Sequence, residues 1–280
     1  MINHNGEIIS NNDLKLTYQN RAFKYGDAVF DTLKFENNRI LFIEDHYFRL
    51  MSSMRMLRIK IPMNFTLNYY EDEILKTLNK NNLLENARIR CTVYREDGGL
   101  FTPKSNSCNF IIEAEELQNV IYNEYEIELY KDFPVFSGLL STIKTNNRIV
   151  NVQASIFANE NSYQNCILIN ENKNLVEASN ANVFLIKENK IFTPALTEGC
   201  INGVIRKKII EMLDKSSIFQ IEESIISPFE LIKVDEVFLT NSIFEIQSVL
   251  KYRKKTYDTD KIDIIRKLFD IFKIEKINSN

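Results

Sequence analysis

The sequence has only two histidines, His4 and His46, among its 280 residues. His4 lies in a polar N-terminal stretch, and His46 lies within a helical pattern. A serine–histidine hydrolase or a histidine-rich metal site would have to use one or both of them. The scarcity of histidine therefore argues against both kinds of site, and no metal is expected. We expect any chemistry to rest on lysine, arginine, tyrosine, carboxylates and a cofactor.

Other absences narrow the class of protein further. The four cysteines form no CxxC pair, so we expect reduced, buried thiols in a cytoplasmic protein. No apolar run approaches the roughly 20 residues that span a bilayer, and the N-terminus lacks the apolar segment of a signal peptide. The net charge is only -3, so neither nucleic acid nor an anionic membrane is an expected partner.

The chain is long enough for two modest domains, and its 7 glycines and 5 prolines argue against long linkers. In the first half, residues 88–95 alternate at period two and residues 108–113 resemble a partner strand. Helical patterns cover 45–57 and 69–80, which predicts an α+β unit with an antiparallel sheet. We predict a small α+β domain at 1–115, an inter-domain connection at 116–123 and a large α/β domain at 124–280 that carries most of the candidate cofactor-binding residues.

The second half alternates strands and helices. Helical spacing predicts helices at 148–158 and 204–213. Four short apolar runs between these helices are predicted to form a meander. The four runs are residues 165–170, 175–177, 182–186 and 190–194.

A lysine, Lys144, lies between an apolar lead-in and the start of a helical pattern. A lysine in that setting could hold a cofactor aldehyde as a Schiff base, although lysine is ordinarily a surface residue. A pyridoxal phosphate enzyme also needs a carboxylate for the ring nitrogen and a phosphate cradle. Glu177 ends an apolar strand, residues 199–203 open a helix, and Arg49 could clamp an anion. Each is equally explained as a strand end, a helix cap or a salt-bridged arginine.

Taken together and in order, these stretches resemble the fold-type IV pyridoxal-phosphate family of branched-chain aminotransferases, D-amino-acid aminotransferases and 4-amino-4-deoxychorismate lyases. The resemblance runs from about residue 20 to 242. The matching stretches are Asn20–Thr32 (N-R-x-F-x-Y-G-D-x-V-F-E-T in the family), His46–Leu50 (H-x-x-R-L), Lys144, Glu177–Phe184 (E-x-x-x-x-N-x-F), Thr193–Pro194 (T-P), Gly199–Arg206 (G-x-x-x-G-x-x-R) and Leu239–Ser242.

The resemblance implies a two-domain D-amino-acid aminotransferase-like fold, pyridoxal 5'-phosphate as cofactor, a small-molecule amino substrate and a homodimer. It makes Lys144 the Schiff-base lysine, Arg49 a phosphate ligand and Glu177 the partner of the pyridine nitrogen. The other cofactor-binding residues that it implies are Asn182, Ile201, Asn202, Gly203, Thr240 and Asn241. The expected substrate contacts are Tyr25, Thr32, Arg95 and Ser242.

The residues after Lys144 bear on the reaction. Asn147 and Arg148 resemble the lyase pattern K-x-x-N-R, and Ile149 occupies the position where branched-chain enzymes favour tyrosine. The first interpretation is therefore aminodeoxychorismate lyase, which forms 4-aminobenzoate and pyruvate in the folate pathway. Residues 95–101 depart from the lyase's R-G-x-G-G-R-G-Y. The alternative is a transaminase acting on branched-chain or D-amino acids with 2-oxoglutarate as acceptor.

Overall fold

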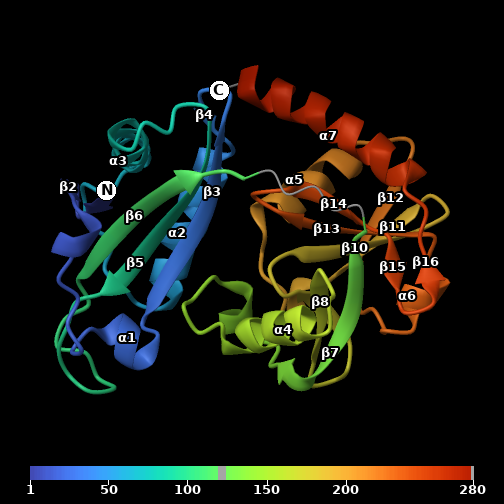
Figure 1. Ribbon diagram of the computed structural model, residues 1–280, viewed down its shortest axis with the longest axis horizontal. Helices are drawn as coiled ribbons and strands as arrows, with labels where there is room; N and C mark the ends of the chain where they lie inside the picture. The colour runs from blue at the N-terminus through green and yellow to red at the C-terminus, as the bar shows by residue number, and fades with distance from the viewer. Residues whose placement is uncertain (119–123, 279–280) are drawn as a thin grey trace. The chain divides into compact units, whose positions relative to one another are not determined.

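The computed structural model describes residues 1–118 and 124–278 of the chain. These residues form two compact units, coloured from blue to red along the chain in Figure 1. The first unit takes in the N-terminal part up to residue 118 together with Ile143–Asn147, and the second takes in the rest. The sequence-based boundaries had placed Ile143–Asn147 in the large domain. Most of the expected connection, 116–123, lies outside the described residues.

The first unit is a six-stranded antiparallel sheet with two long helices on one face. The strand order is β2-β1-β6-β5-β3-β4, and Figure 1 shows α2 lying along β3. The predicted antiparallel sheet and both predicted helices are confirmed. The elements are β1 (Ile2–His4), β2 (Glu7–Ile9), a 3-10 turn (Asn11–Asp13), α1 (Arg21–Tyr25), β3 (Ala28–Glu36), β4 (Arg39–Ile40), α2 (Ile43–Met56), α3 (Leu67–Lys80), β5 (Asn86–Arg95) and β6 (Cys108–Glu116).

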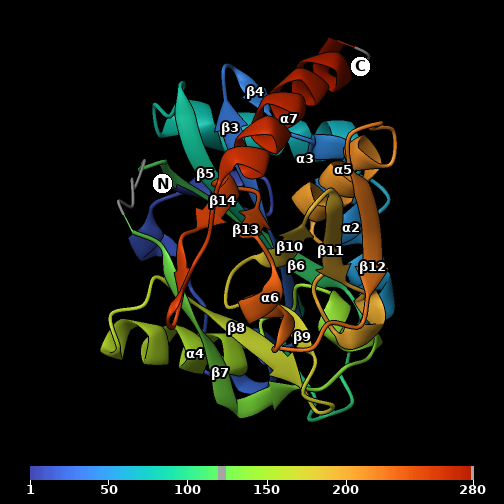
Figure 2. The ribbon, with the colours of Figure 1, turned by 90° about the vertical axis from the view of Figure 1, so that its right-hand side faces the viewer.

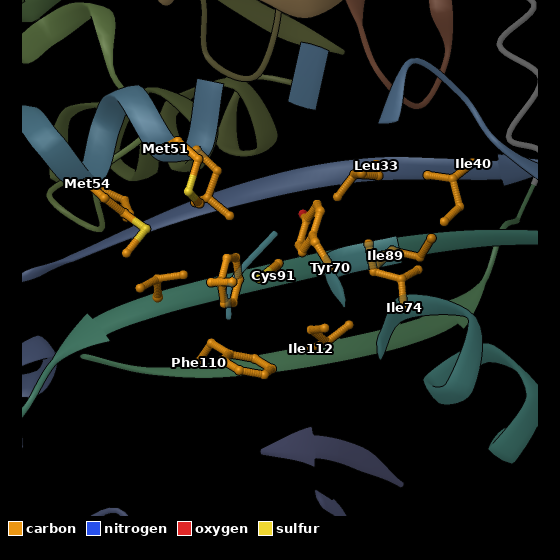
Figure 3. Close-up of a cluster of buried hydrophobic side chains, with 14 of the residues drawn as sticks. Leu33, Ile40, Met51, Met54, Tyr70, Ile74, Ile89, Cys91, Phe110 and Ile112 are labelled. Atoms are coloured by element: carbon orange, nitrogen blue, oxygen red, sulfur yellow. The ribbon is translucent and has the colours of Figure 1, made fainter. Parts of the chain in front are cut away.

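Alternation at period two decides which face of this sheet is buried. On β5, Ile89 and Cys91 are completely buried, whereas Arg90 and Thr92 point to the other face. Figure 3 shows side chains of α2 and α3 and of β3, β4, β5 and β6 meeting in one apolar cluster. Burial of large apolar side chains is the main force holding such a layer together. The opposite face of the sheet is left for polar and charged side chains.

The second unit contains two five-stranded sheets. Their strand orders are β12-β11-β10-β13-β14 and β16-β15-β7-β8-β9, and Figure 2 shows α4 beside β7 and β8. The elements are β7 (Glu126–Val135), a 3-10 turn (Leu139–Thr142), α4 (Ile149–Glu160), β8 (Asn165–Asn170), β9 (Leu175–Ala178), β10 (Asn182–Lys187), β11 (Lys190–Pro194), a 3-10 turn (Leu196–Glu198), α5 (Val204–Leu213), β12 (Gln220–Ser224), α6 (Glu230–Lys233), β13 (Glu236–Asn241), β14 (Glu245–Val249), β15 (Lys251–Tyr252), β16 (Lys255–Thr256) and α7 (Asp260–Asn278).

The predicted meander is wrong in its pairing. β8 pairs with β9 in one sheet, and β10 pairs with β11 in the other. The chain therefore changes sheets between Ala178 and Asn182, within three residues. This change of sheets sets Glu177 and Asn182, two predicted cofactor residues, at the ends of strands from different sheets.

Within residues 1–118 and 124–278, no helix combines the length and the apolar character needed to cross a membrane.

The four cysteines are free thiols; Cys91, Cys166 and Cys200 are buried, as expected, and Cys108 is half-buried. Burial raises the pKa of the Cys200 thiol to about 12 despite the nearby charge of Arg206, so this thiol stays protonated.

Candidate functional site

Lys144 lies on an extended segment that pairs with the start of β3. The Phe30 amide donates a hydrogen bond to the Lys144 carbonyl at 2.8 Å, and the Asn146 amide donates to the Ala28 carbonyl at 3.0 Å. Val29 and Thr145 form an antiparallel bridge. The Lys144 ammonium lies 4.9 Å from the centre of the Phe30 ring. The lysine is therefore held on the sheet face opposite the apolar core.

A second cation, Arg90, lies over the same aromatic ring. Its guanidinium carbon is 3.8 Å from the centre of the Phe30 ring, and its Nε donates to Thr92 Oγ1 at 3.3 Å. Glu113 lies 3.6 Å from the same Nε. Burial lowers the pKa of Arg90 from its ordinary value, although the group stays charged at any physiological pH. In the described part of the chain, neither terminal nitrogen of Arg90 has a hydrogen-bond acceptor.

Sequence reasoning missed Arg90, although a signal was present. Thr32 was predicted to contact substrate, and it lies directly opposite Arg90 in the β3–β5 register. Period-two alternation in β5 places Arg90 on the same face as Thr92, away from buried Ile89. An arginine on that face beside the predicted lysine segment was a better candidate for a substrate carboxylate than one at the end of the strand.

The structure gives Arg95, the arginine at the strand end, a different role from the one expected. Arg95 is 6% exposed, and its Nε donates to Asp27 Oδ2 at 2.9 Å. Its other nitrogens donate to the carbonyls of Leu57 and Arg58 and to Asn106 Oδ1, at 2.6, 3.1 and 2.6 Å. The guanidinium thus ties the end of β5 to the loop after α2. We therefore do not retain Arg95 as a substrate residue.

Asp27 binds a second arginine as well, Arg21, whose Nε lies 2.8 Å from Asp27 Oδ2. Arg21 also donates to the carbonyls of Gly98 and Leu100 at 3.1 and 2.6 Å. Its guanidinium lies 4.9 Å from the centre of the Tyr25 ring, another predicted substrate contact. One half-buried carboxylate thus holds α1 and the end of β5 together and, through Arg21, the loop 98–101.

Arg49, the predicted phosphate ligand, pairs with a buried aspartate of β3. Its Nε and Nη2 lie 2.9 and 2.6 Å from the two carboxylate oxygens of Asp31. His46 Nδ1 is 2.7 Å from Asp31 Oδ1. Burial alone would raise the pKa of Asp31, but Arg49 and His46 outweigh it and hold that pKa well below its usual range.

In the second unit, the backbone of Ile201 joins two predicted cofactor residues. Its amide donates to Glu177 Oε2 at 2.8 Å, and its carbonyl accepts from Asn182 Nδ2 at 2.9 Å. The carboxylate of Glu177 also acts on Arg148, because its charge opposes the lowering of the Arg148 pKa by burial. Glu177 is thus a buried carboxylate that accepts a hydrogen bond from the Ile201 amide.

The N-terminus of α5 has the features of an anion site. Gly203 is its N-cap and supplies no side-chain cap, and the first amides of a helix lack intrahelical partners. A Cβ on Gly203 would lie 2.1 Å from Asn182 Oδ1. Opposite Asn182 in the β10–β13 register stands Thr240, whose buried Oγ1 has no hydrogen-bond partner among the described residues.

The loop after β13 is held to the sheet-changing turn. Asn241 Nδ2 donates to the Asn180 carbonyl at 3.2 Å, and its Oδ1 accepts from the amides of Ile243 and Phe244 at 2.9 and 3.0 Å. Ser242 lies within this turn and is partly exposed. The unpartnered Thr240 hydroxyl beside the uncapped N-terminus of α5 fits a phosphate group, so the residues present suit the expected cofactor.

The predicted residues are divided between the two units. Tyr25, Thr32, Arg49, Arg95 and Lys144 belong to the first unit, and the remaining predicted residues belong to the second. The segment Ile143–Asn147, which carries Lys144, is followed and preceded along the chain by residues of the second unit. The Thr142 carbonyl, two residues before the lysine, accepts a hydrogen bond from the Asn202 amide at 3.1 Å. Arg148, four residues after it, is the arginine that responds to the charge of Glu177.

Most of these residues fall within a region that matches a known family. The sequence model described as amino-transferase class IV covers residues 28–252. A probable branched-chain-amino-acid aminotransferase of Aquifex aeolicus is 27% identical over 95% of this chain and 89% of its own length. An aminodeoxychorismate lyase of Vibrio harveyi is 26% identical over 82% of this chain and 84% of its own.

The fold agrees with a solved member of this group. A crystal structure of the Escherichia coli branched-chain amino acid aminotransferase matches with a TM-score of 0.88 at 22% identity, over 97% of this chain and 94% of that one. The expected D-amino-acid aminotransferase-like fold, of the fold-type IV class, is therefore confirmed.

The contact between Gly203 and Asn182 predicts a specific effect on cofactor binding. Gly203→Ala should force Asn182 away from the Ile201 carbonyl and weaken pyridoxal 5'-phosphate binding by about tenfold or more. Gly138→Ala is the matched control, because a Cβ there meets no atom within 4 Å. Titration of the apoprotein, followed by visible absorbance, gives both dissociation constants. Equal affinities in the two variants would contradict the proposed cradle.

Proposed function

The chain belongs to the amino-transferase class IV family and is a pyridoxal 5'-phosphate enzyme, and among the activities of this family we propose that it is an aminodeoxychorismate lyase. The reaction forms 4-aminobenzoate and pyruvate and belongs to folate biosynthesis. The observation that carries this choice is the position five residues after Lys144. Ile149 stands there, 67% exposed, where the branched-chain pattern has a tyrosine hydroxyl. Asn147 and Arg148 before it follow the lyase pattern.

The bound cofactor supplies an electron sink, and the protein supplies position and proton transfer. In the proposed site, the Glu177 carboxylate keeps a proton on the ring nitrogen. Thr240 Oγ1 and the first amides of α5 bind the phosphate. Lys144 Nζ accepts a proton from the substrate's six-membered carbon ring. Loss of this proton makes the product aromatic as pyruvate leaves. Arg90, beside Lys144 over the Phe30 ring, binds a substrate carboxylate.

Asn147 has a structural role that supports the lyase pattern. Its Nδ2 donates to the Gly26 carbonyl at 3.1 Å, and a Cβ on Gly26 would lie 2.3 Å from its Oδ1. Gly26 has φ 62°, a left-handed conformation that favours glycine. Asn147 thereby ties the lysine segment to the turn that carries Tyr25.

A transaminase is the second candidate function, and a specific observation favours it. The Aquifex aeolicus relative, a probable branched-chain-amino-acid aminotransferase, aligns with more of this chain than the Vibrio harveyi lyase does. The arrangement of Lys144 and Arg90 also suits an amino acid, since its carboxylate and its amine lie close together. Lys144 would then move a proton between the substrate Cα and the cofactor, with 2-oxoglutarate as the amino acceptor.

Parallel assays of the purified holoenzyme separate the two functions. With aminodeoxychorismate, we expect release of 4-aminobenzoate and pyruvate in equal amounts, without any oxo acid having been added as an amino acceptor. With leucine or D-alanine and 2-oxoglutarate, we expect glutamate formation to be slower by about a hundredfold or more, or absent. Amino transfer without release of 4-aminobenzoate would rule out the lyase proposal and leave the transaminase.

Replacement of Lys144 tests the proposed role of its amine. The wild-type protein should be yellow when purified with cofactor, whereas Lys144→Ala should lose the visible band and at least about 99.9% of activity. Lys131→Ala, at an exposed lysine of β7, should keep both. A Lys144→Ala protein with an unchanged absorption spectrum would mean that another amine holds the cofactor.

We also propose a homodimer, supported by an apolar surface of the second unit. Ile149, Val152 and Ile156 lie at helical spacing on α4 and are 67, 48 and 45% exposed. Leu139 and Leu140, in the 3-10 turn before Lys144, are 77 and 63% exposed. Contiguous exposed apolar side chains of this kind mark protein interfaces.

Light scattering coupled to gel filtration tests the dimer. Wild type should elute at twice the chain mass of 32.9 kDa, because burial of the α4 surface would stabilise association. The double variant Val152→Asp/Ile156→Asp should shift to the monomer, since it places charges within that surface. Asn172→Asp adds a charge at an exposed position between β8 and β9, outside α4, and should stay dimeric. A monomeric wild type would refute the proposal.

A further inference from the structure

The ion pair of Arg49 and Asp31 is asymmetric in its exposure. The Asp31 side chain is 1% exposed and that of Arg49 is 12% exposed, so the carboxylate is the inner partner. Asp31 Oδ1 accepts from three donors: Arg49, His46 and its own neighbour, the Thr32 amide at 2.7 Å. The other oxygen, Oδ2, accepts from Arg49 Nε. The carboxylate is thus fully satisfied and fixed in orientation.

His46 stabilises this arrangement as a neutral ring. Burial lowers the pKa of His46, and the Asp31 charge only partly offsets that shift. A neutral imidazole that faces a carboxylate through Nδ1 carries its proton on that nitrogen and donates it. His46 therefore adds a hydrogen bond without a second positive charge. Arg49 remains the sole full cation paired with Asp31 among the described residues.

Stability alone does not account for the buried ion pair of Asp31 and Arg49. Removing a carboxylate and a guanidinium from water is costly, and well-packed apolar side chains often stabilise a core equally well. The surrounding cluster contains such side chains, including Leu50, Met54 and Leu33. What the pair provides that an apolar cluster does not is a guanidinium held in one plane, since two parallel hydrogen bonds prevent rotation about its terminal bonds.

We propose that Asp31, supported by His46, is a positioning residue that orients Arg49 toward the phosphate of the cofactor. The proposal rests on the assignment of Arg49 as a phosphate ligand. Asp31 itself does not touch the cofactor and acts through the guanidinium alone. Its contribution to binding should therefore be confined to ligands that carry a phosphate. Pyridoxal, which shares the ring and the aldehyde but lacks the phosphate, is the matched probe.

Asp31→Asn is the direct test, because it keeps the shape and removes the charge that fixes Arg49. Titrations of apoprotein with pyridoxal 5'-phosphate and with pyridoxal give two dissociation constants for each variant. We expect about a tenfold loss of affinity for the phosphorylated ligand and less than about a twofold change for pyridoxal. Glu44→Gln, at an exposed carboxylate in the first turn of α2, should change neither value.

Two outcomes would overturn the proposal. Equal losses for both ligands would mean that Asp31 acts through the general fold of the unit, and no loss for either would mean that it does not orient Arg49. If Asp31→Asn fails to fold, His46→Gln provides the same comparison with a smaller expected loss of about threefold for the phosphorylated ligand alone. A His46→Gln protein that binds both ligands normally would then overturn it.

Arg49→Met separates failure of this inference from failure of the underlying assignment. If Arg49 binds the phosphate, Arg49→Met should weaken pyridoxal 5'-phosphate selectively, and adding Asp31→Asn should cause no further selective loss. If Arg49→Met leaves that affinity unchanged, the assignment of Arg49 is wrong, whatever Asp31 does. A selective effect of Asp31→Asn that persists in the Arg49→Met background would show that Asp31 acts by another route.

Discussion

The pairing of Ile143–Asn147 with the start of β3 is the constraint on which the candidate site depends. Chain on both sides of this segment belongs to the second unit, while its own backbone hydrogen bonds are made within the first. Lys144 thus has its carbonyl fixed by Phe30 and its amine beside the Phe30 ring. A catalytic amine works only within a narrow range of geometry. Here that geometry is set by main-chain pairing, which no side-chain substitution removes directly.

Buried and half-buried charges in the first unit are arranged in small, locally neutralised groups. Asp27 is shared by two arginines, and Asp31 pairs with one arginine and a neutral histidine. Buried charges persist in a fold only when they are paired and hydrogen-bonded. These groups also bracket the lysine segment along β3, because Asp27 precedes the strand and Asp31 lies within it. The strand therefore serves as the frame for the first half of the candidate site.

The sequence predicted the repeating elements well and the pairing between them poorly. Alternation identified β5 and β6, and helical spacing identified α2, α3, α4 and α5, because each depends on neighbours along the chain. The change of sheets between Ala178 and Asn182 was missed, since two short apolar strands look the same whether or not they pair. The short strands from β14 onward were too brief to carry a pattern.

The site residues divide in the same way. Collinear family motifs predicted Lys144 and Glu177, but they could not predict that Gly203 must lack a Cβ because Asn182 is there. Arg95 was expected at the substrate, yet it has the same parity along β5 as the buried residues Ile89 and Cys91 and therefore faces inward. Arg90 has the opposite parity. The period-two alternation along β5 therefore already placed Arg90 and Arg95 on opposite faces of the sheet.

The loop 98–101 is held mainly through its backbone, with one ring contact between Phe101 and Tyr25 at 5.6 Å between centroids. Arg21 binds the carbonyls of Gly98 and Leu100, while the Leu100 and Phe101 side chains are 76 and 90% exposed. Any residue offers the same carbonyl, so the side chain at position 100 can be exchanged while the path of the loop is retained. Directed evolution could therefore vary position 100 without first having to rebuild the scaffold.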